Sequence, residues 1–120
     1  TLAARSIYAN GILTQKFNLN STFSKKDHRA SWLKKQRLKN IYNQKKLLNS
    51  LSKEKIEKFS LDFVLRFKMF EKIIVGLRTK KQVKDFLTNI ENSKKIDKKY
   101  IKKIIDLHKN NAFFNSKEKY

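Results

Sequence analysis

The segment KKDHRASWLKKQRLKNIYNQKKLL, residues 25–48, has the residue types of a phosphate-binding surface. Nine of its side chains are Lys or Arg, and Asp27 is its only acid. On RNA, such side chains contact phosphate and the 2′-hydroxyl face, and they position a protein without reading the sequence. The candidate phosphate-binding residues here are Lys25, Lys26, Arg29, Lys34, Lys35, Arg37, Lys39, Lys45 and Lys46.

Two aromatic residues of this segment, Trp32 and Tyr42, have two possible roles. Their rings could stack on unpaired bases, or they could pack in the protein core. Both lie near an apolar series at helical spacing, which favours the core.

A second basic cluster lies near the C-terminus. Its lysines occur in pairs that recur every four residues, so they occupy one broad helical face opposite Ile101, Ile104 and Ile105. A solvated face in a lysine-rich chain is the alternative to phosphate contact. The cluster consists of Lys94, Lys95, Lys98, Lys99, Lys102 and Lys103.

The residue types that most often carry catalysis are few and scattered. His28 and His108 are the only histidines, and both have basic surroundings, so we expect surface or capping roles for them. The chain has no cysteine, and Gly11 and Gly76 form no glycine-rich phosphate loop. We therefore expect no enzyme activity, no metal and no cofactor.

Positive charge extends over the whole chain of 120 residues, whose formal net charge is +20. Residues 1–60 contribute +11 and residues 61–120 contribute +9. Self-repulsion of this size opposes a compact monomer, and a phosphate-rich partner would neutralise it. No apolar run approaches the roughly 20 residues that a membrane-spanning helix needs.

Long helices are expected, because the chain has no proline and two glycines. Residues 1–24 are polar and irregular, with a possible short helix around Ile12–Phe17. Apolar residues at a period near 3.6 predict a helix from Arg29 to Leu51, and Ser52 is the predicted N-cap of the next helix.

Residues 53–78 are the most apolar part of the chain and are predicted to form one buried core helix. Thr79 and Gln82 then form a T-x-x-Q capping box, and the helix that they begin ends at Asn92-Ser93. A last helix from Ile96 ends at Asn110-Asn111, and Phe113 and Phe114 could dock the final residues.

This pattern predicts an all-α fold, an extended bundle of about four helices with irregular basic N-terminal and C-terminal tails. The predicted organisation is an irregular segment 1–24, a helical body 25–113 and a tail 114–120.

Three short segments resemble small-subunit ribosomal protein fifteen, a small helical rRNA-binding family. They are LTQKFN (13–18), KKDH (25–28) and NQKKLLNSL (43–51). The resemblance implies that His28 and the basic residues after it form a turn that grips an rRNA junction. It places Lys45 and Lys46 on the arginines of a later helix. The chain departs from the family pattern at Arg29, where the family has a second histidine, and at Ser50, where it has a tyrosine.

The segment FLTNIENSKKIDKKYIKKIIDLHKNNAF, residues 86–113, is similar to the C-terminal domain of large-subunit ribosomal protein twenty. Met69 stands where that family has a tryptophan. Both resemblances imply the same class of function, rRNA binding within a ribosome.

The opening residues 1–17 contain Arg5, Lys16, several hydroxyl residues and no acid, which is typical of the end of an organellar presequence. We therefore expect a ribosome of the mitochondrial matrix, with a cytosolic ribosome as the less favoured alternative.

The predicted function is that of a structural constituent of a mitochondrial ribosome that binds rRNA through basic helix faces. The expected partners are rRNA and neighbouring ribosomal proteins, with no small-molecule substrate and no homo-oligomer. One alternative is a lineage-specific mitoribosomal subunit that contacts mainly proteins. Others are a non-ribosomal organellar assembly or accessory factor and a basic protein at an anionic membrane surface.

Overall fold

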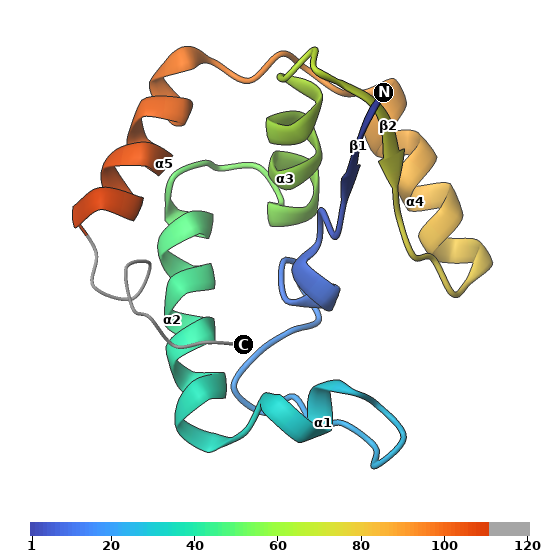
Figure 1. The fold of residues 1–120 in the computed structure, drawn as a ribbon, viewed down its shortest axis with the longest axis vertical. Helices are drawn as coiled ribbons and strands as arrows, with labels where there is room; N and C mark the ends of the chain where they lie inside the picture. Colours follow the sequence, from blue (N-terminus) through green and yellow to red (C-terminus); the bar gives the residue numbers. More distant parts are fainter. Residues whose placement is uncertain (111–120) are drawn as a thin grey trace.

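The computed structural model describes residues 1–110. Short helices surround a central one, α3, with α2 and α5 on one side of it and two strands and α4 on the other (Figure 1). In chain order the elements are β1 (Leu2–Arg5), the 3-10 turn η1 (Ala9–Gly11), α1 (Arg29–Trp32), α2 (Lys35–Ser50), α3 (Ile56–Leu65), β2 (Phe70–Ile74), α4 (Lys80–Glu91) and α5 (Lys98–Asn110).

The structure confirms a mainly helical chain, but the prediction of an all-α fold is wrong. β1 and β2 form a two-stranded parallel sheet in which Ala3 pairs with Lys72 and Arg5 pairs with Ile74. Both strands are short and lie far apart in the chain. Strands of four and five residues are too short to show a clear alternation of apolar and polar residues, and a local pattern cannot reveal a partner that lies far away in the chain.

The predicted core helix over residues 53–78 is wrong in its second half. α3 ends at Leu65, a turn follows, and Phe70–Ile74 is β2. Phe67 packs edge-on against Phe63 and Phe70 at ring-centroid distances of 5.2 and 6.4 Å, so the turn brings the three rings together. β2 pairs with the backbone of β1, and the local sequence of residues 70–74 contains no sign of this distant partner.

The predicted helix Arg29–Leu51 is broken after Trp32. Leu33 and Lys34 leave the helical conformation, and Lys35 starts α2 with a φ of 35°. The break turns Leu33 inward, where it is 4% exposed. Ser52 is not the N-cap of α3, which is Lys55; the Ser52 hydroxyl accepts a hydrogen bond from the Glu54 backbone N–H at 3.1 Å.

The prediction for the start of α4 is confirmed. The Thr79 hydroxyl accepts from the Gln82 backbone N–H, and the Gln82 side chain accepts from the Thr79 backbone N–H, each at 3.2 Å. α4 ends at Glu91, directly before the predicted Asn92-Ser93 stop. α5 begins at Lys98, two residues after Ile96. Phe113 and Phe114 lie outside the described residues.

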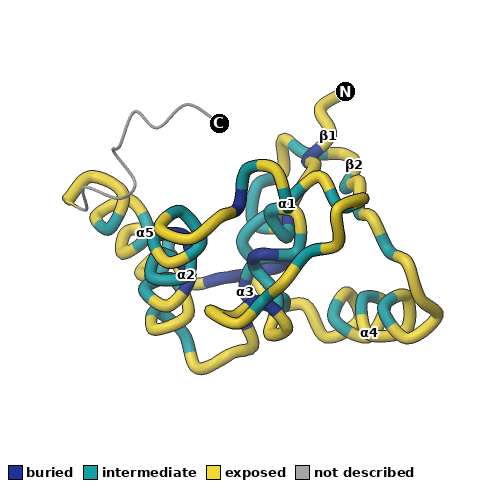
Figure 2. The backbone as a smooth tube through the Cα atoms, turned by 90° about the horizontal axis from the view of Figure 1, so that it is seen from below, coloured by how far each residue is buried: buried dark blue, intermediate teal, exposed yellow. Residues whose placement is uncertain are grey.

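Residues 1–24 are irregular outside β1 and η1, but they are not a tail, because they supply side chains to both hydrophobic cores. Ile12 and Phe17 join Leu33 and Ile41 in the first core, and the expected helix around Ile12–Phe17 is replaced by η1 and turns. The second core consists of Ala4, Ile7 and Leu61. The buried parts of the tube in Figure 2 gather around α3, while α4 and α5 are mostly exposed.

Candidate nucleic-acid interface

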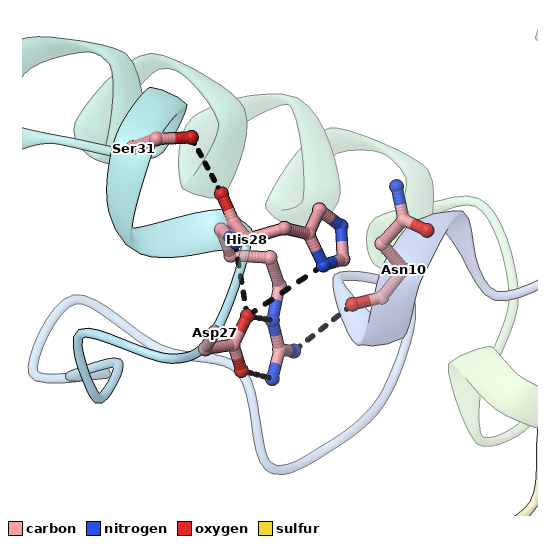
Figure 3. A network of polar contacts seen from close by, with 5 residues as sticks. Asn10, Asp27, His28 and Ser31 are labelled. Atoms are coloured by element: carbon pink, nitrogen blue, oxygen red, sulfur yellow. Dashed lines mark hydrogen bonds and ion pairs between the residues drawn. The ribbon is translucent and has the colours of Figure 1, made fainter.

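The KKDH turn is held by an ion pair between Asp27 and Arg29 (Figure 3). One Asp27 oxygen accepts from the Arg29 backbone N–H and Nε, at 2.9 and 3.0 Å, and the other accepts from Nη2 at 2.6 Å. These hydrogen bonds, together with the positive charge of Arg29, hold the pKa of Asp27 far below its usual range. The turn is therefore already formed before any partner binds.

Arg29 also joins this turn to the N-terminal segment. Its Nη1 donates to the Asn10 carbonyl at 2.9 Å, and its guanidinium lies 4.4 Å from the centre of the Phe23 ring. At Gly11 the backbone φ is +87°, and a Cβ there would come within 3.0 Å of Nη1, so glycine fits this contact best. The structure thus occupies Arg29 with internal contacts, although the sequence predicts that it binds phosphate.

Lys45 is removed from the exposed surface as well. The residue is 9% exposed, and its Nζ donates to the carbonyls of Thr14 and Phe17. Burial lowers the pKa of Lys45, and the nearby Glu57 carboxylate acts in the opposite direction. Lys45 therefore ties residues 14–17 to α2, and its predicted role on an RNA-facing helix does not fit this position.

The remaining members of the first basic cluster, apart from Arg37, are exposed and available to a ligand. Arg37 is half-buried, with its guanidinium 5.7 Å from the centre of the Trp32 ring. Trp32 and Tyr42 pack partly against the first core, as the sequence favoured. The exposed members are Lys25, Lys26, His28, Lys34, Lys35, Lys39 and Lys46.

All six lysines of the second cluster are exposed. Lys94 and Lys95 precede α5, so the predicted single helical face includes only the four that follow. Tyr100 of α5 packs edge-on against Phe59 of α3 at 5.9 Å between ring centres, and Ile96 is buried. These contacts fix the inner side of α5 and direct its lysines outward.

α2 and α5 are neighbours in both Figure 1 and Figure 2, so Lys35, Lys39 and Lys46 are on a helix beside the helix of the second cluster. The other exposed members of the first cluster belong to the segment around α1, at the N-terminal end of α2 and away from α5 (Figure 1).

Few lysines of the two clusters have an acidic partner. Lys99 lies 3.7 Å from Asp97, whereas the shorter ion pairs of Glu54, Asp62 and Asp85 are made with Lys58 and Lys81, outside both clusters. The positive charge of the two clusters is therefore largely uncompensated.

A pocket of about 290 Å³ opens between residues 15–18 and α2, next to exposed Lys46. Its aromatic rings and side-chain amides are groups that contact unpaired bases in RNA. Sequence reasoning missed Gln15, Asn18 and Asn49, because nothing local indicates that they meet. The lining residues are Gln15, Phe17, Asn18, Tyr42, Lys45, Lys46, Asn49 and Ile56.

Glu57 links this region to the N-terminal segment. Its Oε1 accepts from the Gln15 backbone N–H at 2.6 Å. Burial, and secondarily the negative charge of Glu57, raise the pKa of Tyr8 to about 12.

Among residues 1–110, no group of three or more His, Cys, Asp or Glu side chains could hold a metal ion. None of the described helices combines the length and the apolar character that crossing a membrane requires.

Comparison with known proteins identifies no relative: no family model, no curated protein and no solved structure matches this chain.

Proposed function

We propose that this protein is an rRNA-binding constituent of a ribosome, and that the ribosome is mitochondrial. The observation that supports RNA binding is that α2 and α5, two helices with exposed and mostly unpaired lysines, are neighbours on one side of the molecule. The ribosomal part of the proposal rests on the two sequence resemblances. The mitochondrial part rests on the composition of residues 1–17 alone, and the structure builds this segment into the sheet and both cores.

Binding would operate through phosphate neutralisation. Residues four apart on a helix lie about 6 Å apart along its axis, so Lys98 and Lys102, like Lys99 and Lys103, can follow an RNA backbone. Each phosphate contact releases condensed counterions, which makes the affinity fall with salt. Because Tyr100 of α5 packs against Phe59 of α3, the lysines of α5 approach RNA on a fixed scaffold.

A pair of triple variants tests this proposal. Lys98, Lys102 and Lys103 of α5 are changed to Gln in one variant, and the exposed Lys80, Lys81 and Lys84 of α4 are changed to Gln in the control. Both lose the same charge. We expect the slope of log affinity for an rRNA fragment against log salt to fall by about 2 in the α5 variant and far less in the control.

Equal effects in the two variants would mean that net charge, and not this surface, drives binding. The ribosomal part has a separate readout, which is cosedimentation of the protein with mitochondrial ribosomal subunits on a sucrose gradient. Sedimentation with a different complex would favour the alternative of an organellar assembly or accessory factor.

One observation favours the second candidate, a mitoribosomal subunit that contacts mainly proteins. Within residues 1–110, seven of the nine strongly exposed large apolar residues lie on the sheet, at the end of α3, in the turn between α3 and β2, or on α4. They are Leu2, Leu65, Met69, Ile74, Val83, Leu87 and Ile90. The apolar face of α4 is thus mostly open, because Val83, Leu87 and Ile90 are exposed and, of this face, Phe86 packs against the second core.

A further inference from the structure

An apolar groove of about 650 Å³ runs beside β1. One wall is the chain from Ala3 to Ile7, and the other includes Phe63 of α3, then Phe67 and Met69 of the following turn. Successive side chains of a strand point to opposite faces. Three consecutive residues of β1, Ala3–Arg5, line the groove, so it follows the edge of the strand and is not confined to one face of the sheet.

This edge of β1 has unused hydrogen-bonding groups. β1 pairs with β2, and within residues 1–110 the backbone of Leu2–Arg5 makes no hydrogen bond to any other segment. Of the usual protections of a free edge, β1 has its short length of four residues, but it contains no proline and Arg5 is its only charged residue. The exposed backbone and the apolar wall together have the features to which extended peptides bind in other proteins.

The charges around the groove select the kind of occupant. Arg5 lines it, and the exposed Lys68 lies between Phe67 and Met69 in the turn. Lys72, also exposed, is opposite Ala3 in the sheet. A second copy of this chain would bring another +20 charge to this place, so a homodimer is disfavoured. A carboxylate-bearing segment complements these cations.

We propose that an extended segment of a partner protein, apolar at alternate positions and carrying acidic residues at its ends, adds to the free edge of β1 as a third strand. Its backbone pairs with β1, its apolar side chains contact Phe63, Phe67 and Met69, and its carboxylates lie near Arg5 and Lys68. This site is separate from the basic side formed by α2 and α5, so it does not depend on RNA binding.

Binding of designed peptides to the full chain, measured by fluorescence anisotropy, tests this proposal. One probe alternates Val or Ile with Thr and ends in Glu residues. A second probe ends in Lys residues, and a third keeps the Glu residues but has a central proline, which cannot pair along the strand. We expect the second and third probes to bind at least about tenfold more weakly than the first.

Two matched variants locate the site. Met69 and Leu19 are 59% and 48% exposed, so Glu at either position should preserve the fold, which the thermal unfolding midpoint will check. We expect Met69→Glu to weaken binding of the acidic probe about tenfold and Leu19→Glu to change it little. Hydrogen exchange of the Ala3–Arg5 amides should slow when the probe binds.

Several results would overturn the proposal. Equal binding of the proline-containing probe would indicate charge attraction without strand pairing, and equal effects of Met69→Glu and Leu19→Glu would place binding elsewhere. A dimer in sedimentation velocity that Met69→Glu dissociates would identify a second copy of the chain as the occupant instead.

Discussion

Lys45 and Lys46 are adjacent in the chain, but their ammonium groups meet different surroundings. The Lys45 Nζ donates to two backbone carbonyls beside the first core, whereas Lys46 is exposed at the mouth of the pocket on α2. The same residue type therefore has a structural role at one position and is available to RNA at the next. Helical rotation explains the difference, because consecutive residues point about 100° apart.

Substitution of each lysine by glutamine should separate these roles. Lys45→Gln cannot reach both carbonyls, and the loss of these hydrogen bonds should lower the free energy of unfolding by about 1–3 kcal/mol. Lys46→Gln should change it by less than about 0.5 kcal/mol, because the side chain is exposed. Urea unfolding of the two variants provides the measurement. Equal losses of unfolding free energy in the two variants would contradict the buried position of Lys45.

The same two substitutions should have the opposite order of effect on RNA binding. Lys46→Gln should reduce the salt slope of RNA binding, by less than about 1, if Lys46 contacts a phosphate. Lys45→Gln should leave that slope unchanged under conditions where the variant is folded. A reduced slope in Lys45→Gln would show that its ammonium group reaches RNA.

Among the elements, α4 has the local sequence signal that corresponds most directly to its structure. The capping box at Thr79 and Gln82 involves residues close in the chain, so its contacts need no tertiary partner. The sheet is the opposite case. β2 was predicted as helix because its apolar residues continue the spacing of α3, and the partner that makes it a strand lies at residues 2–5.

Thr79→Ala should destabilise α4 by about 1 kcal/mol, because it removes the acceptor for the Gln82 N–H. Thr88, an exposed residue inside the same helix, is the matched control. Thr88→Ala should stabilise the helix by a few tenths of a kcal/mol, since alanine has the higher helix propensity. Hydrogen exchange of the α4 amides measures both changes. Faster exchange in both variants would contradict the cap assignment.

For the whole molecule, charge and apolar surface are distributed unevenly. The side with α2 and α5 has exposed lysines with few acidic partners, and the side with the sheet and α4 has most of the exposed apolar residues. We interpret the first as the proposed RNA surface and the second as the proposed protein-docking region. The net charge of +20 comes from the composition of the whole chain, and the isolated molecule must tolerate the repulsion that it causes.

Stability should therefore increase with ionic strength. Added KCl screens the repulsion among the lysines and should raise the thermal unfolding midpoint, and polyphosphate should raise it further by binding the folded surface. The triple α5 variant, with three fewer positive charges, should respond less to KCl. A midpoint that falls or stays constant as KCl rises would show that self-repulsion does not limit the fold.

The sequence alone determined the mainly helical character, the start of α4, the position of the last helix and the anionic kind of partner that we expect. These properties depend on composition and on residues a few positions apart. Tertiary structure decided that Arg29 and Lys45 are internal, that residues 1–24 complete two cores, and that residues 70–74 form a strand. Each of these features depends on contacts between segments that are far apart in the chain, and a local sequence pattern does not reveal such contacts. The basic cluster at residues 25–46 illustrates both contributions. Its charge is evident in the sequence, but only the tertiary structure shows which of its members are exposed.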